Sequence, residues 1–222
     1  MKIAVFYHCL FCIGNEPLWS AVKVVHEQMK ALKESGLEDA ATEIHIGVNG
    51  GKESEIYAKQ FLPKRAQITY HGLESRAENL TIVMLEKWLK DHDGWCVLYF
   101  HCKGATHPLD SSYAAYSGSW RRTMMGHLVE NWRFCVRDLI VGAEACGCNW
   151  LTGQGWDHSQ NIFGGNFWWA KSSFLRLLPS IYERARIKTS GIGALESRYE
   201  SEVWIGNGPR LPLVKVYQPG GM

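Results

Sequence analysis

Apolar runs alternate with amphipathic segments through the first half of the chain. The runs are short and end in polar residues or glycine, which is typical of strands buried on both faces of a parallel sheet. The segments between them repeat apolar residues at helical spacing. The pattern predicts strands at Lys2 to His8, Glu43 to Val48, Ala66 to Tyr70 and Trp95 to His101, with helices at Leu18 to Lys33 and Glu74 to Lys90.

The pattern becomes more aromatic and less regular beyond Gly104. A loop through Pro108 precedes a long helix predicted from Tyr113 to Val141. The other predicted elements are strands at Cys148 to Thr152, Asn161 to Ala170 and Leu213 to Tyr217, and helices at Ser172 to Arg186 and Ala194 to Ile205.

The alternation of strands and helices predicts the fold class, which is α/β with an open, mostly parallel sheet flanked by helices. Ligands of such sheets bind beyond the carboxyl ends of the strands. The residues at these predicted ends are therefore the candidate binding site. They are Tyr7, His8, Asn49, His71, His101, Lys103 and Gly104.

Length and charge narrow the function classes. A chain of 222 residues is within the range of one domain, spanning 1–222, and a net charge of +2 gives no general affinity for nucleic acid. The opening MKIAVFYHCLFCIGNEP is apolar for too short a stretch to span a bilayer and lacks a small-residue cleavage pattern. We therefore expect a buried first strand, no membrane span and a cytoplasmic protein.

The cysteines allow two interpretations. Seven cysteines, an odd number in a chain with no secretion signal, favour free thiols over a disulfide framework. Cys9 and Cys12 form a CxxC, and Cys146 and Cys148 a CxC, so a four-thiolate zinc site would form if the fold brought the pairs together. Neither pair lies in a Gly-rich turn, and buried free thiols are the expected state.

Three segments carry a resemblance to a known family. They are LYFHCKG ending at Gly104, GNFWWA ending at Ala170 and RYESEVWIG ending at Gly206. They resemble motifs of GT-A-like glycosyltransferase-like proteins of bacteria and viruses, and IAVFYH and IGVNG are also similar to that group. The resemblance implies one continuous GT-A-like domain, with a Rossmann-type, nucleotide-sugar-binding half at 1–104 and an acceptor half at 105–222.

The implied activity is that of a hexosyltransferase-type glycosyltransferase. Its donor would be a nucleotide sugar, and its acceptor a hydroxyl of a polysaccharide, a protein or a modified nucleobase. Many GT-A enzymes place an Asp-x-Asp after a central strand to hold a divalent cation, Mn or Mg, against the donor diphosphate. This sequence departs from that pattern, because the corresponding place holds His101-x-Lys103. It therefore gives no requirement for a cation, and a bound Mn or Mg stays an open alternative.

Two interpretations of this departure stay open. Lys103, and His101 if protonated, would neutralise the leaving diphosphate directly, or His101 would only satisfy buried backbone groups. The literal Asp-x-Asp at Asp91 and Asp93 precedes the strand, and we predict a solvated turn there. Arg121 follows Trp120 and is a candidate for binding phosphate or base, although such pairs also occur on solvated helix faces.

Aromatic and acidic residues in the second half supply candidates for acceptor binding and catalysis. Indole faces stack on pyranose rings, which makes Trp150 and Trp168 candidates. Trp168 and Trp169 must point to opposite faces of their strand, so Asn166, two residues before Trp168, shares its face and is paired with it.

An inverting transferase needs a carboxylate as base. Glu202 is the first candidate, with Arg198 one turn earlier as its partner or as an acceptor ligand, and Asp157 is the second. A purely structural pair of Arg198 with Glu202 is the other interpretation.

Two further classes of function remain. The chain would be a non-catalytic carbohydrate- or nucleotide-binding module if it lacks turnover, or a zinc-stabilised nucleic-acid-binding protein if the cysteine pairs meet. Modified DNA as acceptor would need a basic channel, which helical periodicity does not favour because it spreads the cations over more than one face. The cations in question are Lys103, Arg121, Arg122, Arg133 and Arg137.

Overall fold

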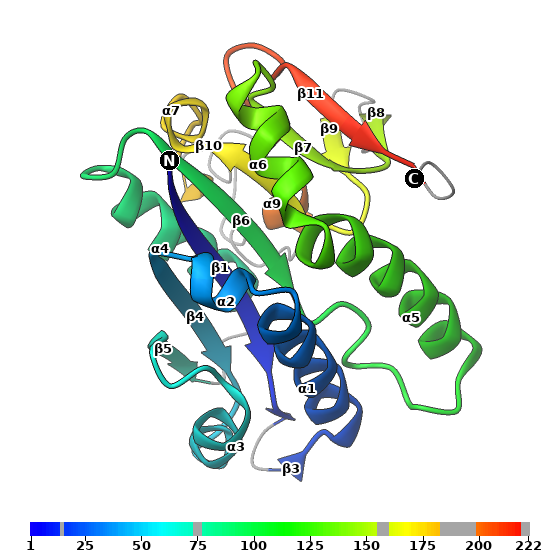
Figure 1. Ribbon diagram of the computed structural model, residues 1–222. Coiled ribbons are helices and arrows are strands. Elements are labelled where there is room, and N and C mark those ends of the chain that lie inside the picture. The colour runs from blue at the N-terminus through cyan, green and yellow to red at the C-terminus, as the bar shows by residue number, and fades with distance from the viewer. Residues whose placement is uncertain (14–15, 73–76, 155–159, 183–198, 219–222) are drawn as a thin grey trace.

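The computed structural model consists of one seven-stranded sheet with helices on both faces, and it describes residues 1–13, 16–72, 77–154, 160–182 and 199–218 (Figure 1). The strands lie in the order β11-β7-β10-β6-β1-β4-β5. Their bounds are β1 Lys2–Leu10, β4 Glu43–Asn49, β5 Gln67–Gly72, β6 Trp95–His101, β7 Ala145–Cys148, β10 Trp168–Lys171 and β11 Val214–Tyr217. The predicted fold class is confirmed.

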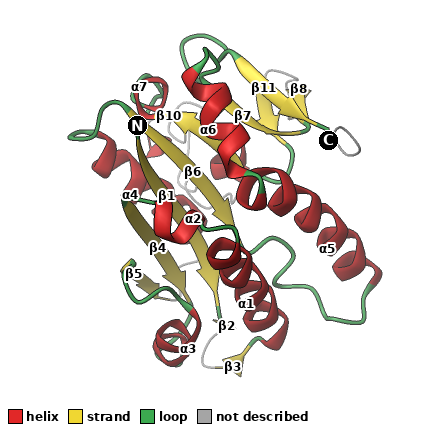
Figure 2. Ribbon diagram, viewed as in Figure 1, coloured by secondary structure: helices red, strands yellow, loops and turns green. Residues whose placement is uncertain are grey.

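The helices form two layers around this sheet (Figure 2). One core cluster joins one sheet face to α1, α3, η1 and α6, and a second joins the other face to α4, α7 and α9. The bounds are α1 Trp19–Glu34, α2 Leu37–Ala40, α3 Ser54–Phe61, α4 Ala77–Leu89, α5 Ser112–Met125, η1 Gly126–Glu130, α6 Trp132–Ile140, α7 Ser172–Leu175 and α9 Tyr199–Trp204. Two small ribbons pair β2 Cys12–Ile13 with β3 Glu16–Pro17, and β8 Trp150–Gln154 with β9 Gln160–Phe163.

The centre of the sheet follows the prediction from apolar runs. Every residue of β6 is buried, and β6 pairs in parallel with β1 from Lys2↔Trp95 to His8↔His101. A continuous apolar run suits this position because both faces of the strand are covered. β10 is antiparallel to β6 and to β7, and it joins the first half of the chain to the second in one sheet.

The strand order fixes the place where ligands bind in open α/β sheets. From β1 the chain adds β4 and then β5 on one side, and it returns to place β6 on the other side of β1. A crevice forms outside the carboxyl ends of the strands at such a reversal. In this chain the reversal lies between β1 and β6.

The prediction of one continuous helix from Tyr113 to Val141 is wrong, because the structure interrupts this helix. The α-helix ends at Met125, a π-helical turn follows as η1, and Asn131 leaves helical geometry with φ −102° and ψ 28°. The backbone and side-chain N–H groups of Asn131 both donate to the carbonyl of Gly126, at 3.1 and 2.8 Å. Local hydrogen bonding thus replaces the helical bonds at this point.

The predicted strands of the second half are also divided. Asn149, at φ 52°, separates β7 from β8, and Asn166, at φ 56°, follows a turn that separates β9 from β10. Positive φ at these residues ends an extended segment. The predicted helix from Ser172 to Arg186 is wrong in its extent, because α7 ends at Leu175 and 176–180 are not helical. The described part of the predicted helix from Ala194 to Ile205 is α9, since 183–198 lies outside the described residues, and the terminal strand is confirmed as β11.

The cysteine pairs do not meet. Cys9 lies on β1 and Cys146 on β7, with β6 and β10 between these strands. All seven cysteines are free and buried, and within the described ranges no group of three or more His, Cys, Asp or Glu residues could hold a metal ion. The zinc site is therefore not supported. The described helices also include none long and apolar enough to cross a membrane.

Candidate functional site

Polar side chains gather at the carboxyl ends of β1, β5 and β6 and at the start of α4. His8, His71 and His101 come from these three strands, and Glu78 and Thr81 come from the first turns of α4. His8 and Thr81 are buried, and the others are partly or largely buried. We call these five residues the strand-end cluster. It brings together three of the residues predicted from the sequence with two that were not predicted.

One hydroxyl links two of the histidines. Thr81 Oγ1 lies 2.9 Å from His8 Nδ1 and 3.1 Å from His71 Nε2. A hydroxyl has a single proton, so Thr81 donates to one imidazole and accepts an N–H from the other. Burial lowers the pKa of His71 to about 4. Burial also lowers the pKa of His8 to about 3, against the opposing charge of Glu78 and with His71 and His101 acting in the same direction. Both imidazoles are therefore neutral at pH 7.

The neighbouring position on β4 has to be glycine. Gly47 lies beside His8 in the sheet, and a Cβ at Gly47 would overlap Thr81 Oγ1 and His71 Nε2. The cluster therefore occupies the volume that a side chain on β4 would otherwise fill.

We expect Gly47→Ala to lower the free energy of unfolding by about 2 kcal/mol, because overpacking forces the hydrogen-bonded Thr81 and His71 side chains to move. Urea unfolding measures the change. Gly142→Ala is a poor control because of its positive φ, whereas Gly126, which has nothing within 4 Å of an added Cβ, serves as the matched site. A loss no larger than that of Gly126→Ala would contradict the packing argument.

Glu78 organises a second network on the other side of the cluster. Its Oε1 accepts hydrogen bonds from Asn166 Nδ2 at 2.7 Å and from the Tyr99 hydroxyl at 3.2 Å. Its Oε2 lies 3.8 Å from His101 Nδ1. His101 Nε2 is 2.9 Å from the Gly165 carbonyl, and since a carbonyl only accepts, Nε2 carries a proton and donates. His101 is thus held by Glu78 and Gly165, as the interpretation of a satisfied buried histidine predicts.

The loop after β6 is braced by a buried arginine. Arg121 Nη1 donates to the Lys103 carbonyl at 2.7 Å, and Nη2 lies 3.3 Å from Glu27. Gly104 has φ 79°, and a Cβ there would lie 2.7 Å from the Ser117 Cβ. Arg121 therefore positions the Lys103 segment, and its guanidinium does not project into solvent as a free phosphate ligand would.

Two other predicted donor residues have different surroundings. Tyr7 is completely buried, and its hydroxyl donates to Gln28 at 2.7 Å, so it belongs to the core between β1 and α1. Asn49 ends β4 as predicted, and its buried Oδ1 has no hydrogen-bond partner among the described residues. An unpaired buried acceptor at a strand end is consistent with a site that a donor group completes.

The predicted acceptor pair is intact but inaccessible. Asn166 Oδ1 accepts from Trp168 Nε1 at 3.0 Å, although Asn166 precedes β10 and does not lie in the strand as predicted. Trp168 and Trp169 pack in opposite core clusters, which confirms their opposite faces. Both Asn166 and Trp168 are 0% exposed, because Trp168 packs between Tyr99 and Trp204. Neither side chain presents a face to a sugar. Trp150 is partly exposed and packs against Phe163.

The predicted catalytic carboxylate Glu202 is half-buried on α9. Burial raises the pKa of Tyr99, and Glu78 and, more weakly, the charges of Cys102 and Glu202 act in the same direction. Asp157 and Arg198 lie outside the described residues, and their predicted roles stay predictions.

A family model described as "Domain of unknown function (DUF8361)" matches residues 6–212. The chain belongs to the DUF8361 family. No curated protein matches its sequence.

Several solved structures are similar to this DUF8361 chain at low identity. A 4-diphosphocytidyl-2C-methyl-D-erythritol synthase from Anaerococcus prevotii DSM 20548 is 12% identical, with 98% of this chain and 88% of that chain covered and a TM-score of 0.45. A CMP:2-keto-3-deoxy-manno-octonic acid synthetase complexed with CTP is 7% identical, with coverage of 98% and 90% and a TM-score of 0.42. Rv0371c from Mycobacterium tuberculosis H37Rv, in complex with manganese, is 6% identical, with coverage of 100% and 90% and a TM-score of 0.41. These scores assign no activity to the DUF8361 chain.

The described donor set of the DUF8361 chain does not fit a divalent cation. Mg²⁺ and Mn²⁺ prefer several oxygen ligands, usually with paired carboxylates. Glu78 is the carboxylate of the strand-end cluster, and its Oε1 already accepts from an amide and a hydroxyl. Asp91 and Asp93 lie in an exposed turn before β6, at the opposite edge of the sheet, as predicted.

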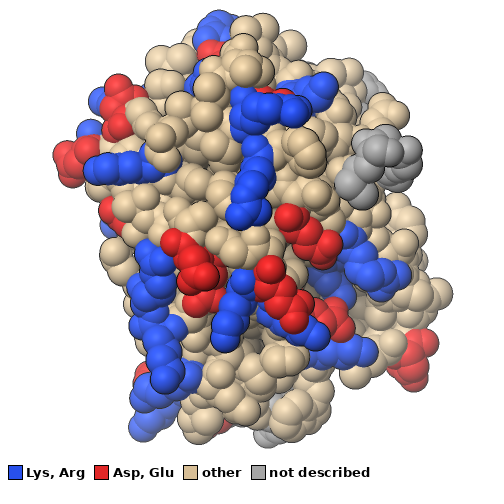
Figure 3. All heavy atoms as spheres, viewed as in Figure 1, with Lys and Arg blue, Asp and Glu red and all other residues tan. Residues whose placement is uncertain are grey.

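The surface charge of the DUF8361 chain offers no extended basic channel on the face that carries α1, where Lys and Arg side chains alternate with Asp and Glu (Figure 3). The helix arginines that would build such a channel diverge. Arg121 is buried against Glu27, Arg133 stacks over the Trp132 ring, and Arg137 is bound to Asp138. Modified DNA as acceptor, which the sequence does not favour, therefore gains no support from these arginines.

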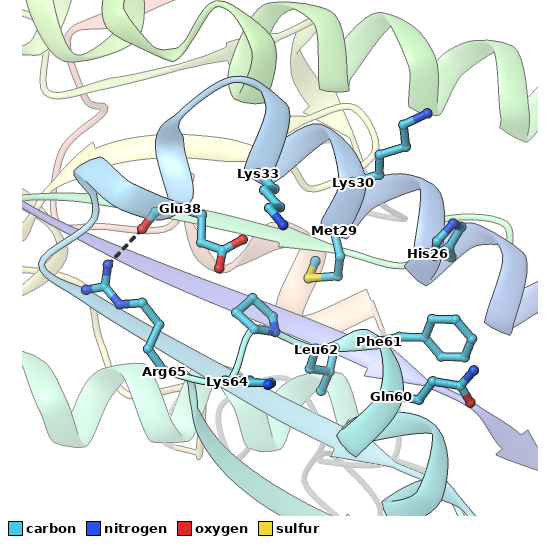
Figure 4. Close-up of a pocket in the computed structure, with 11 residues that line it drawn as sticks. His26, Met29, Lys30, Lys33, Glu38, Gln60, Phe61, Leu62, Lys64 and Arg65 are labelled. Atoms are coloured by element: carbon cyan, nitrogen blue, oxygen red, sulfur yellow. Dashed lines mark hydrogen bonds between the residues drawn. The ribbon is translucent and has the colours of Figure 1, made fainter.

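A groove of about 650 Å³ between α1 and the α3–β5 connection is separate from the strand-end cluster. Lys33, Glu38 and Lys64 line it (Figure 4). Arg65 donates to the carbonyls of Glu38 at 2.9 Å and Ala41 at 2.7 Å, and so fixes the end of α2. Because these carbonyls immediately precede β4, the groove lies toward the amino-terminal edge of the sheet.

Sequence reasoning missed Glu78 and Thr81, the two α4 residues of the cluster. The available signal was an acidic residue in the first turn of a helix that follows a strand, since carboxylates are favoured there. That signal is common on ordinary helices, and the role of Glu78 depends on Asn166, which is 88 residues away along the chain.

Proposed function

We propose that this DUF8361 protein is a glycosyltransferase that uses a nucleoside-diphosphate sugar as donor and a hydroxyl group as acceptor. The observation that carries the proposal is the coincidence of two features at one place. The strand order reverses between β1 and β6, and the polar strand-end cluster lies at the carboxyl ends around that reversal. Nucleotides bind at this place in open α/β sheets.

Lys103 is the proposed diphosphate ligand. It directly follows the end of β6, its side chain is half-buried, and among the described residues no carboxylate lies within ion-pair distance of its ammonium group. Arg121 holds its carbonyl, which leaves the side chain as the movable part. His101 has a different role from a cationic clamp, because its Nε2 is bound to the Gly165 carbonyl and its Nδ1 lies on the side of Glu78, at 3.8 Å. We infer that His101 positions the Lys103 segment.

Glu202 is the proposed general base, and Trp150 the proposed acceptor contact. Glu202 is half-buried and its charge acts on Tyr99, whose hydroxyl is bound to Glu78. A partly buried carboxylate suits proton removal from an acceptor hydroxyl. A glycan is the favoured acceptor, since Trp150 is partly exposed and an indole face can stack on a pyranose ring.

Lys103→Ala is expected to weaken binding of a sugar nucleotide by about tenfold or more, because one charge-assisted contact to phosphate contributes about 1.5–3 kcal/mol. The measurement is a thermal-shift and donor-hydrolysis screen over UDP-, GDP-, CMP- and dTDP-sugars, with and without manganese. Lys33→Ala, in the groove near the other edge of the sheet, is the matched control.

The outcomes separate the candidate functions. A donor that is bound and hydrolysed without manganese, with a loss in Lys103→Ala alone, supports a transferase with a cationic clamp. Saturable binding without hydrolysis indicates the non-catalytic binding module instead. If no sugar nucleotide binds the parent protein under any condition, the proposal fails.

A further inference from the structure

A second cavity lies between η1, α6 and β11, three strands away from β6 in the sheet. Its volume is about 480 Å³, within the range of small-molecule sites. All the residues that line it belong to the described part of the chain. They include His127, Phe134, Arg137, Asp138, Lys215 and Tyr217.

The break in the long helix shapes this cavity. An uninterrupted helix would continue its regular surface past Gly126, but the π-helical turn and Asn131 displace the segment that carries His127. The His127 ring then lies parallel to the ring of Tyr217 on β11, at 7° and with 5.7 Å between centroids. π-helical turns inside helices recur at functional sites. The cavity therefore lies where the chain departs from regular helical structure.

The polar groups of the cavity are arranged around one buried carboxylate. Asp138 Oδ1 accepts from Arg137 Nη2 at 2.9 Å and Nε at 3.1 Å, and Oδ2 accepts from the Tyr217 hydroxyl at 2.9 Å. Burial, with Cys146 and Cys135 nearby, raises the pKa of Tyr217, so its hydroxyl stays protonated and donates. Asp138 is therefore satisfied and its charge is balanced by Arg137.

The remaining polar capacity favours an anion. The Lys215 side chain is exposed, and no carboxylate of the described residues lies within ion-pair distance of it. The Phe134 ring is 51% exposed, with the Arg137 guanidinium 5.0 Å from its centroid. Flat aromatic faces bind rings, and an ammonium group with no carboxylate partner binds carboxylate or phosphate.

We propose that this cavity binds a small ring compound that carries an anionic group, either a sugar acid or a nucleotide. Phe134 and Tyr217 contact the ring, and Lys215 contacts the anion. The site is independent of the proposed donor site at the end of β6, and it does not need the transferase activity.

Four probes test the proposal on the full chain by isothermal titration and by NMR of the His127 ring. They are methyl β-D-glucuronide, uridine monophosphate, the neutral methyl β-D-glucoside and inorganic phosphate. At least one anionic ring probe is expected to bind saturably, and about tenfold more tightly than the neutral sugar and phosphate. Its dissociation constant is expected to rise about tenfold in Lys215→Ala and about fivefold in Phe134→Ala.

Both variants change exposed side chains, so the fold is expected to persist. Lys103→Ala is the control and is expected to keep the binding of the ring probe. If the transferase proposal fails, the expected results of these titrations do not change. The two ring probes distinguish a sugar acid from a nucleotide. The proposal is overturned if neither ring probe saturates, if phosphate binds as tightly as both, or if Lys103→Ala and not Lys215→Ala abolishes binding.

Discussion

Glu78→Ala is expected to lower the free energy of unfolding by about 3–4 kcal/mol, since each buried donor left without its acceptor costs about 1–3 kcal/mol. Two such donors depend on Glu78. Asn166 Nδ2 and the Tyr99 hydroxyl both bind Oε1, and both residues are completely buried. Trp168 Nε1 in turn donates to Asn166, so the loss extends to a third side chain. Urea unfolding at pH 7, followed by tryptophan fluorescence, measures the change.

Two further variants make this result specific. Glu78→Gln keeps an acceptor for Asn166 and is expected to lose about half as much stability, because hydrogen bonds to a neutral group are weaker than those to a charge. Glu55→Ala removes an exposed carboxylate from α3 and is expected to have little effect. A Glu78→Ala loss below that of Glu78→Gln would show that the network contributes no net stability.

Most of the first half of the fold was predictable because local pattern and final environment agree there, whereas the short helix α3, Ser54–Phe61, was not predicted. β6 and α1 lie within one residue of their predicted bounds. Both have an unambiguous period, continuous for a strand covered on both faces and helical for α1. The break at η1 was not predictable, since the sequence from Met125 to Trp132 contains no proline and the decisive contacts are those of Asn131 with Gly126.

The site was predictable in place but not in composition. Strand ends indicate an edge of the sheet, so His8, His71 and His101 were found from the sequence and do lie in one cluster. The accessibility of Trp168 was not predictable in the same way. Periodicity correctly gives its face, but the cover on that face comes from Trp204 on α9, whose ring centroid is 6.1 Å away. A period says which residues share a face and not what covers it.

Acidification is expected to destabilise the protein already at pH values above those at which most carboxyl groups titrate. The pKa of His8 is about 3 in the folded protein, against 6.5 as its ordinary value. The unfolded chain therefore binds a proton at His8 below pH 6.5 that the folded protein does not bind. The stability due to the neutral imidazole is complete above pH 6.5, and it is lost progressively as the pH falls toward the folded pKa. Each pH unit in this window corresponds to about 1.4 kcal/mol, or about 3 kcal/mol between pH 6.5 and 4.

His8→Asn isolates this contribution, because an amide can keep a hydrogen bond to Thr81 but does not titrate. Urea unfolding of the parent and the variant at several pH values between 7 and 4 gives two slopes, and the variant is expected to show the smaller one. His26→Asn, at an exposed position on α1, is expected to keep the parent slope. The pKa of His71 is also lowered, and His71 is still present in His8→Asn. The slope of stability against pH in this variant is therefore expected to be smaller than in the parent but not zero. Parallel slopes for parent and His8→Asn would mean that His8 becomes protonated without unfolding the strand-end cluster. In that case the stability of the protein would not depend on a neutral imidazole at His8.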